Sequence, residues 1–434
     1  MPSRYSQQRG PILSWFLDKL GSPGEQQGGE APRTFQGRPI VKMSWKGREA
    51  EAVQGLLAYR REHPEPIKRE EAERGLMTDV LATTELDPLG IGVIVTDEQF
   101  EIERAASAAP ALGPDVLWTE PVLLDHGALV PNDTFFAQQW NLAEVNAIGG
   151  WDNWNGDPHG VVLAILDTGV PIEAGRLSHT DLDDVGRISL AGDMVNNDAD
   201  PADDHGHGTH VTGIAAAATN NGVGVAGLWP GDVLIAKVFN AANDGSSITF
   251  RDGVLAAVNF AKQRGARLVI NYSGGGPDTR TKRETVEFAR QNDALIVAAA
   301  GNESGGGIIH PAAYSTDFVN VIAVGAVDRQ RRRPAFASRG PEMTVVAPGV
   351  DILSSLPNYF VTLNQLGKQT KYDRLGGTSQ AAPVVAALAS LVWSKRLDLT
   401  AEQVRDRITQ TATPIAGSAQ DFGHGIINAE AALR

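Results

Sequence analysis

Short apolar runs dominate the second part of the chain. Five of them occupy residues 160–167, 233–239, 266–273, 294–302 and 319–327. Runs this short, apolar on both faces, are typical of parallel strands that are covered on both sides. Helical patterns lie between them over residues 208–218, 250–265 and 281–292, and small apolar residues predict a further buried helix over 376–393. This alternation predicts an α/β fold with a doubly wound, mainly parallel sheet and helices on both faces.

The first part of the chain has a different pattern. Residues 21–37 are rich in Gly, Pro and Gln, which indicates a linker. Beyond it the charge density is high, and we expect strands over 39–45, 90–96 and 116–124 and helices over 50–62 and 97–109. We therefore divide the chain into an N-terminal extension and linker (1–37), a small α+β unit (38–125) and the large α/β domain (126–434).

Composition narrows the choice of partners and compartment. The formal net charge of −14 argues against nucleic acid and anionic membrane surfaces as partners, because both require clustered Lys and Arg. The absence of cysteine excludes disulfides, thiolate catalysis and Cys-ligated zinc. No apolar run reaches the roughly 18 residues of a membrane span. The apolar run that begins at residue 11 stops at Asp18, too short for a signal-peptide core. We expect a cytoplasmic protein, with an extracellular location as the alternative.

Polar residues follow the predicted strands at the edge where such a sheet binds its ligands. Asp167 ends the first apolar run, Ser273 the third and Asn302 the fourth, while His207 and Ser379 begin helices of small residues. A serine hydroxyl needs an imidazole to take its proton and a carboxylate to orient the imidazole. We therefore assign Ser379 as nucleophile, His207 as base and Asp167 as the orienting carboxylate.

A serine at a helix start is also a common N-cap. We assign that cap to the neighbouring Thr378, because an attacking oxygen at Ser379 gains from the helix dipole and from a free backbone N–H. The spacing of His205, His207 and His210 also suggests zinc, but no fourth ligand has the spacing of a zinc motif.

The chain order Asp, His, Ser is that of subtilisin. On the segments LAILDTGV, DDHGHGTHVTGIAA and GGTSQAAPVV, the chain from about residue 132 to 434 resembles the subtilisin-like serine proteases. The resemblance implies a serine endopeptidase that hydrolyses polypeptide substrates, with Asn302 of VAAAGNES as an oxyanion donor. The alternative is a catalytically silent pseudo-protease that binds extended peptides.

The resemblance also implies a peptide-binding cleft with two edge segments that add to an extended substrate. Gly274 and Ile309 depart from the residues usual in the family, so we expect a shallow pocket for modest apolar side chains. The family pattern implies a cis bond before Pro311. The implied substrate-binding residues are Gly245, Ser246, Ser273, Gly274, Gly275, Ala299, Gly301 and Ile309.

Calcium is the cofactor we expect, at two places. Oxygen ligands at short spacing, the kind that Ca²⁺ prefers, occur at Asp193, Asn196, Asp198 and Asp200, although an acidic surface turn is the alternative. The resemblance implies a second, tighter site. Its side-chain ligands would be Asp133, Asp181 and Asn221, and its carbonyl ligands those of Thr219, Val223 and Val225.

The preceding unit, residues 38–125, matches in order and size the propeptide of this family. The resemblance implies a zymogen whose propeptide-like domain is an intramolecular inhibitor, with residues 116–129 in the cleft and autoprocessing within 124–131. The alternative is an unrelated N-terminal domain.

Overall fold

The computed structural model of the protein describes residues 130–182, 186–304 and 306–434. It also describes residues 34–35, 38–45, 48–61, 68, 72, 76, 80–83, 91–96, 109–112 and 116–123. The chain divides into two compact units, Met1–Gly127 and Ala128–Arg434. The division lies two residues from the boundary that the sequence pattern predicts.

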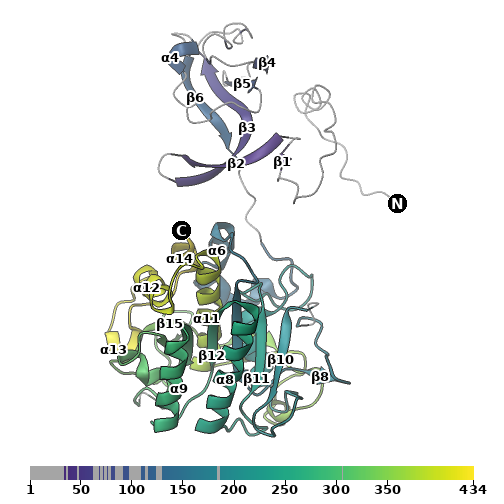
Figure 1. The fold of residues 1–434 in the computed structure, drawn as a ribbon, viewed down its shortest axis with the longest axis vertical. Helices are drawn as coiled ribbons and strands as arrows, with labels where there is room; N and C mark the ends of the chain where they lie inside the picture. Colours follow the sequence, from purple (N-terminus) through teal and green to yellow (C-terminus); the bar gives the residue numbers. More distant parts are fainter. Residues whose placement is uncertain are drawn as a thin grey trace. The chain divides into compact units, whose positions relative to one another are not determined.

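A seven-stranded parallel sheet forms the centre of the second unit, with the order β10-β11-β7-β12-β13-β14-β15 (Figure 1). All five predicted runs are strands, and the two outermost strands, β10 and β15, were not predicted. Half-exposed positions break the apolar run of β10, and β15 has only four residues. The strands are β7 (Val161–Asp167), β10 (Ile188–Asp193), β11 (Val233–Lys237), β12 (Arg267–Tyr272), β13 (Ala294–Ala299), β14 (Val321–Val327) and β15 (Val345–Pro348).

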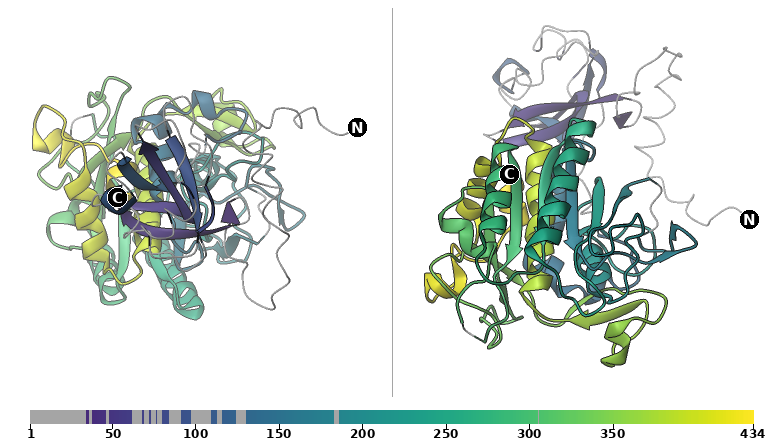
Figure 2. Two further views of the ribbon diagram at one scale, coloured as in Figure 1. Left: turned by 90° about the horizontal axis from the view of Figure 1, so that it is seen from above. Right: turned by 60° about the horizontal axis from the view of Figure 1, so that its bottom comes forward.

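Helices cover both faces of this sheet, and the strands feed two cores. In β7, Val161, Leu163 and Ile165 pack in one core with α7 and α11, and the alternate residues pack in the other with α8 and α9. Side chains of a strand alternate between the two faces of the sheet, and each face of β7 packs in a core. Every position of the strand is therefore apolar, which makes the apolar run continuous. Figures 1 and 2 show α8 and α9 side by side along the sheet. The long helices are α7 (His207–Ala216), α8 (Ser247–Arg264), α9 (Arg280–Gln291), α11 (Thr378–Lys395) and α12 (Ala401–Thr411).

Short elements complete this unit. They are η1 (Phe136–Gln138), α5 (Trp140–Glu144), α6 (Ala147–Asn153), β8 (Ile172–Glu173), β9 (Arg176–Leu177), η2 (Ala312–Thr316), β16 (Ile352–Ser355), α10 (Thr362–Gln365), β17 (Tyr372–Leu375), α13 (Ala419–Phe422) and α14 (Ala429–Leu433). The His310–Pro311 bond is cis, as the resemblance implied. Throughout the described residues, no helix has both the length and the apolar character needed to cross a membrane.

The first unit contains a six-stranded antiparallel sheet. The three predicted strands are confirmed, but the helix predicted over residues 50–62 is wrong, because this segment is β3. Hydrogen bonding of β3 to β2, β5 and β6 outweighs the helix propensity of its Glu, Ala and Leu residues. The helix predicted over 97–109 lies, up to residue 108, outside the described residues. The elements are β1 (Thr34–Phe35), β2 (Arg38–Trp45), β3 (Arg48–Arg61), β4 (Val80–Thr83), β5 (Ile91–Thr96), α4 (Ala109–Leu112) and β6 (Val116–Leu123).

Candidate active site

The polar residues predicted from the strand ends gather at one edge of the parallel sheet. Asp167 is the last residue of β7, and Ser273 directly follows β12, the neighbouring strand in which Tyr272 pairs with Leu166. Asn302 lies just beyond β13 on the other side of β12. Helices α7 and α11, which pack against each other, begin at His207 and Thr378.

Asp167 and His207 form a buried pair. The Nδ1–H of His207 donates to Asp167 Oδ1 at 2.7 Å, and the side chains of the two residues are 10% and 1% exposed. The backbone N–H of Thr168 donates to the same oxygen at 2.8 Å, while Oδ2 is buried without a partner among the described residues. Burial lowers the pKa of His207, but the charge and hydrogen bond of Asp167, together with the charge of Asp203, outweigh burial, so the pKa is raised. With its proton on Nδ1, the neutral imidazole keeps Nε2 as a base.

A second buried carboxylate, Asp203, organises the start of α7 around His207. It is 1% exposed, and its two oxygens together accept hydrogen bonds from the Thr168 hydroxyl and from the backbone N–H groups of His205, Gly206 and Thr209. Asp203 was not among the predicted site residues, although an acidic residue just before a helix of small residues is a recognisable capping signal.

His210 has a structural role one turn along α7. Its ring is buried, and its Nε2 donates to the carbonyl of Ile352 at 3.0 Å. Burial lowers the pKa of His210 to about 3, so the imidazole is neutral.

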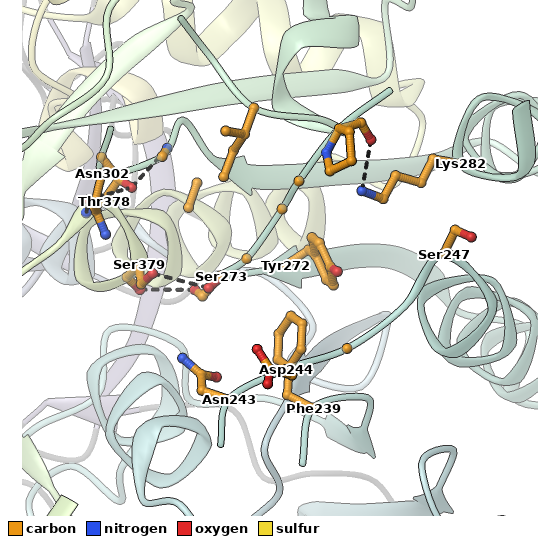
Figure 3. Close-up of a pocket in the computed structure, with 18 of the residues that line it drawn as sticks. Phe239, Asn243, Asp244, Ser247, Tyr272, Ser273, Lys282, Asn302, Thr378 and Ser379 are labelled. Atoms are coloured by element: carbon orange, nitrogen blue, oxygen red, sulfur yellow. Dashed lines mark hydrogen bonds between the residues drawn. The ribbon is translucent and has the colours of Figure 1, made fainter. Parts of the chain in front are cut away.

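Ser379, the second residue of α11, is joined to Ser273 by two hydrogen bonds (Figure 3). Ser379 Oγ donates to the Ser273 carbonyl at 3.0 Å, and Ser273 Oγ donates to the Ser379 carbonyl at 2.9 Å. Pro383 explains the second bond, because proline has no N–H to donate to the carbonyl four residues earlier. The hydroxyl of Ser273 takes that place and ties the end of β12 to the start of α11.

The N-cap predicted at Thr378 is wrong, because α11 has Gly377 at its N-cap position and Thr378 is its first residue. The Thr378 hydroxyl instead accepts from the Gly301 N–H at 3.1 Å and donates to Asn302 Oδ1 at 3.2 Å. Asn302 Oδ1 also accepts from the Thr378 N–H at 3.0 Å. These bonds fix the amide with Oδ1 toward α11, which leaves Nδ2 as a donor beside Ser379.

Ser379 and Asn302 line a cavity of about 470 Å³ (Figure 3). The predicted substrate-binding residues all line the same cavity. They are Gly245, Ser246, Ser273, Gly274, Gly275, Ala299, Gly301 and Ile309. Asp244 and Tyr272, from the two predicted edge segments 244–247 and 271–276, also line it, and so do Phe239 and Lys282, which the sequence pattern did not indicate.

Two unusual residues shape this cavity. The side chain of Ile309 lies between Gly275 and Gly301, since a Cβ on Gly275 would be 2.6 Å from its Cδ1 and a Cβ on Gly301 would be 3.1 Å from its Cγ1. The ring of Phe239 packs against Gly274, since its Cζ would lie 2.4 Å from a Cβ at position 274. Phe239 thus fills the space that a larger residue at 274 would occupy, which sequence spacing could not reveal.

The residues of the predicted tighter calcium site lie in or next to the loop over residues 219–225. Asp133 Oδ2 accepts from the Asn220 N–H at 2.9 Å, and its buried Oδ1 has no partner among the described residues. Asp181, fully buried, accepts from Asn221 Nδ2 at 3.1 Å and from the Val225 N–H at 2.8 Å. Burial raises the pKa of Asp181 to about 6, and the Asp133 charge adds to the effect.

Backbone oxygens in this loop complete the donor set. The carbonyls of Thr219, Val223 and Val225 accept no hydrogen bond from the described part of the chain. Two buried carboxylates and three free carbonyls form an oxygen-rich set that fits a hard cation.

The cluster predicted at residues 193–200 is a hydrogen-bonded turn. Asp193 is buried and accepts from the N–H groups of Val195 and Asn196 and from the Asn196 side chain, while Asp198 Oδ1 accepts from the Asp200 N–H. Among the described residues, no three His, Asp or Glu side chains lie together as metal ligands would. Both these carboxylates and Asp181 accept hydrogen bonds from their own surroundings, so calcium binding at residues 193–200 stays a prediction.

A doubly wound sheet that carries a buried His–Asp pair and a serine at a helix start along one edge defines the class of serine hydrolases. The model of the subtilase family matches residues 158–425. The chain is 37% identical over 316 residues to a thermophilic serine proteinase of Bacillus sp. (strain AK1), covering 73% of this chain and 72% of that protein.

Other relatives show the same likeness. Subtilisin DY of Bacillus licheniformis is 39% identical, over 63% of this chain and 91% of its own. Thermitase of Thermoactinomyces vulgaris is 33% identical, over 70% and 99%. The solved structure of a protease from Pseudoalteromonas arctica PAMC 21717 matches with a TM-score of 0.59 at 28% identity, covering 70% of this chain and 98% of that one. The chain belongs to the subtilase family and is a subtilisin-like serine endopeptidase.

Proposed function

We propose that this endopeptidase hydrolyses peptide bonds through Asp167, His207 and Ser379. The Ser379 hydroxyl, which donates to the Ser273 carbonyl in this structure, must first turn toward His207 Nε2. In the acylation step Ser379 Oγ then attacks the scissile carbonyl while its proton passes to His207 Nε2, and the imidazolium gives that proton to the leaving amine. Asp167 keeps the His207 proton on Nδ1 and stabilises the imidazolium. The buried 2.7 Å bond between Asp167 and His207 is the observation that carries this proposal.

Charge on the substrate oxygen is stabilised by two donors. The Ser379 N–H lies in the first turn of α11, where backbone N–H groups are free and the helix dipole favours negative charge. Asn302 Nδ2 is the second donor, because Thr378 holds the Oδ1 side of that amide. These donors are in place before reaction, so charge develops without reorganisation.

The substrate backbone pairs with residues 273–275 as an added strand. The N–H and carbonyl groups of Gly274 and Gly275 form no hydrogen bond with the described part of the chain, and Gly245 on the opposite rim is equally free. These groups are therefore available to an extended peptide that crosses the cavity.

Replacement of the nucleophile tests the triad. We expect Ser379→Ala to abolish labelling by a fluorophosphonate probe and peptide cleavage together, with an unchanged melting temperature. Ser390→Ala is the matched control, since Ser390 lies in the same helix and donates only to the Ala386 carbonyl. Cleavage that persists in purified Ser379→Ala contradicts the assignment, and peptide binding by the wild type without labelling or cleavage supports a pseudo-protease.

We further propose that Ca²⁺ binds at Asp133, Asp181 and Asn221 together with the carbonyls of Thr219, Val223 and Val225. The orphaned Asp133 oxygen and the raised pKa of Asp181 support this site, because both indicate carboxylates that lack a countercharge. A bound cation would neutralise them and join the segment around residue 133 to two distant loops.

Chelation tests the calcium site. In the Ser379→Ala background, which prevents self-digestion, excess EGTA should lower the melting temperature, because a ligand that binds only the folded state stabilises it by mass action. Asp181→Asn should weaken calcium binding in titration calorimetry, whereas Asp198→Asn, in the exposed turn, should not. A melting curve that EGTA leaves unchanged in metal-loaded protein would count against the site.

Residues 38–125, we propose, act as an intramolecular inhibitor that is removed by self-cleavage within residues 124–131. Support comes from the separate compact unit that contains them and from its strand β6, which ends just before that segment. Incubation of the full chain should produce a new N-terminus within 124–131 by mass spectrometry, and Ser379→Ala should stay intact. Full activity of an uncleaved chain would contradict this proposal.

A further inference from the structure

A buried lysine lines the active-site cavity, away from Ser379 (Figure 3). Lys282, in the first turn of α9, is 6% exposed, and it is the only cationic side chain among the described residues that line the cavity. Its Nζ donates to the Pro277 carbonyl at 3.1 Å. A Cβ on Gly276 would lie 3.3 Å from the same nitrogen, so the ammonium lies next to Gly276 on the side to which a side chain there would point.

The charge of Lys282 is poorly compensated. An ammonium has three donors, and the Pro277 carbonyl takes one of them. Within the described part of the chain no carboxylate forms an ion pair with Lys282, and the nearby Asp278 accepts from the Tyr314 hydroxyl. Burial lowers the pKa of Lys282. A cation is also unfavourable at a helix N-terminus, and α9 has no acidic residue in its first turn. An anionic group that reaches Lys282 would supply the missing countercharge, against the repulsion of Asp244 and Glu303, which also line the cavity.

Strand register identifies which substrate residue reaches Lys282. The bond between Ser379 Oγ and the Ser273 carbonyl places Ser273 opposite the residue that precedes the scissile bond. Strand β12, which ends at Tyr272, is buried between β7 and β13, so an added strand runs along 273–276 and not further back. In antiparallel pairing Gly276 then lies opposite the fourth residue before the scissile bond, about 10 Å along the strand. The N–H and carbonyl of Gly276 bond to His310, so this is a pair without hydrogen bonds to the substrate. Residues directly opposite each other point to the same face, so that side chain stands over Lys282.

We propose that Lys282 selects a glutamate at the fourth position on the N-terminal side of the scissile bond. The inference rests on the proposed function and adds the substrate class to it. The absence of a side chain at Gly276 opens the path to the ammonium, and the longer glutamate reaches it better than aspartate does.

Two internally quenched peptides, identical except for Glu or Gln at that fourth position, test the proposal. A charge-assisted hydrogen bond in place of a neutral one should make kcat/KM for the Glu peptide about tenfold higher. Lys282→Met, which keeps most of the aliphatic stem, should bring the Glu-to-Gln ratio close to one, and Lys282→Arg should retain the preference. Arg280→Gln is the matched control, because Arg280 carries the same charge in the same helical turn but is almost fully exposed.

The outcomes separate this inference from the proposed function. Equal cleavage of both peptides by the wild type, or a Glu preference that survives Lys282→Met in folded protein, overturns the role of Lys282 and leaves the peptidase assignment intact. A Glu preference lost equally in Arg280→Gln also overturns it, since the effect would then be general surface charge. Cleavage of neither peptide, together with no fluorophosphonate labelling, refutes both.

Discussion

Ile309 should set the size of the residue accepted directly before the scissile bond. Its side chain crosses the space between Gly275 and Gly301, at the end of the cavity that also contains Ala299. The Ile309 backbone is held at both ends, by N–H donation to the Ala300 carbonyl and acceptance from the Ala313 N–H. Substitution by alanine therefore removes three carbon atoms without releasing the backbone.

The magnitude follows from the volume released. Burial of one methylene contributes about 0.8 kcal/mol, so space for three carbons allows a Phe side chain to gain about 2.4 kcal/mol. At about 1.4 kcal/mol for each factor of ten, kcat/KM for a peptide with Phe before the scissile bond should rise roughly 50-fold in Ile309→Ala. The peptide with Ala at that position should change little, because its methyl group does not reach the vacated space.

The assay is a series of peptides with Ala, Val, Leu or Phe before the scissile bond, compared by kcat/KM. We expect the wild type to favour the smaller side chains and Ile309→Ala to favour Phe. Ile248→Ala is the matched control, because Ile248 is an exposed isoleucine outside the cavity lining. A wild-type enzyme that already prefers Phe, or a profile identical in wild type and Ile309→Ala, would refute the assignment of Ile309 to this pocket.

Three further predictions concern the reaction centre. Asp167 raises the pKa of His207, and only the neutral imidazole accepts a proton, so activity should fall as pH drops through that raised pKa. Asp167→Asn should move this acidic fall in the pH–activity profile to lower pH and reduce kcat by about 10⁴. A fall in activity at an unchanged pH would contradict the pairing of Asp167 with His207. Asn302→Leu should lower kcat by about 10²–10³ with little change in KM, and a change in KM alone would argue against an oxyanion donor. Gln380, not methionine, follows Ser379, so hydrogen peroxide should spare most activity. Gln380→Met should make the enzyme sensitive to peroxide, because methionine oxidation would put a polar sulfoxide next to the nucleophile. Rapid inactivation of the wild type, with every methionine shown by peptide mapping to be unoxidised, would indicate a different target.

Local sequence determined the sheet and the positions of the reacting residues. The five continuous apolar runs are strands because a strand with helices on both faces must be apolar on both. Asp167, Ser273 and Asn302 could be placed at one edge because parallel strands align their carboxyl ends. These inferences use periodicity and chain direction, which a linear pattern contains.

Tertiary structure decided the features that depend on a distant partner. Segment 48–61 is a strand because three other strands pair with it, although its composition favours a helix. The hydroxyl of Thr378 bonds to Asn302, 76 residues away, instead of capping its own helix. Hydrogen-bond partners and the space around a side chain are set by packing between segments far apart in sequence, which residue order along one segment does not encode.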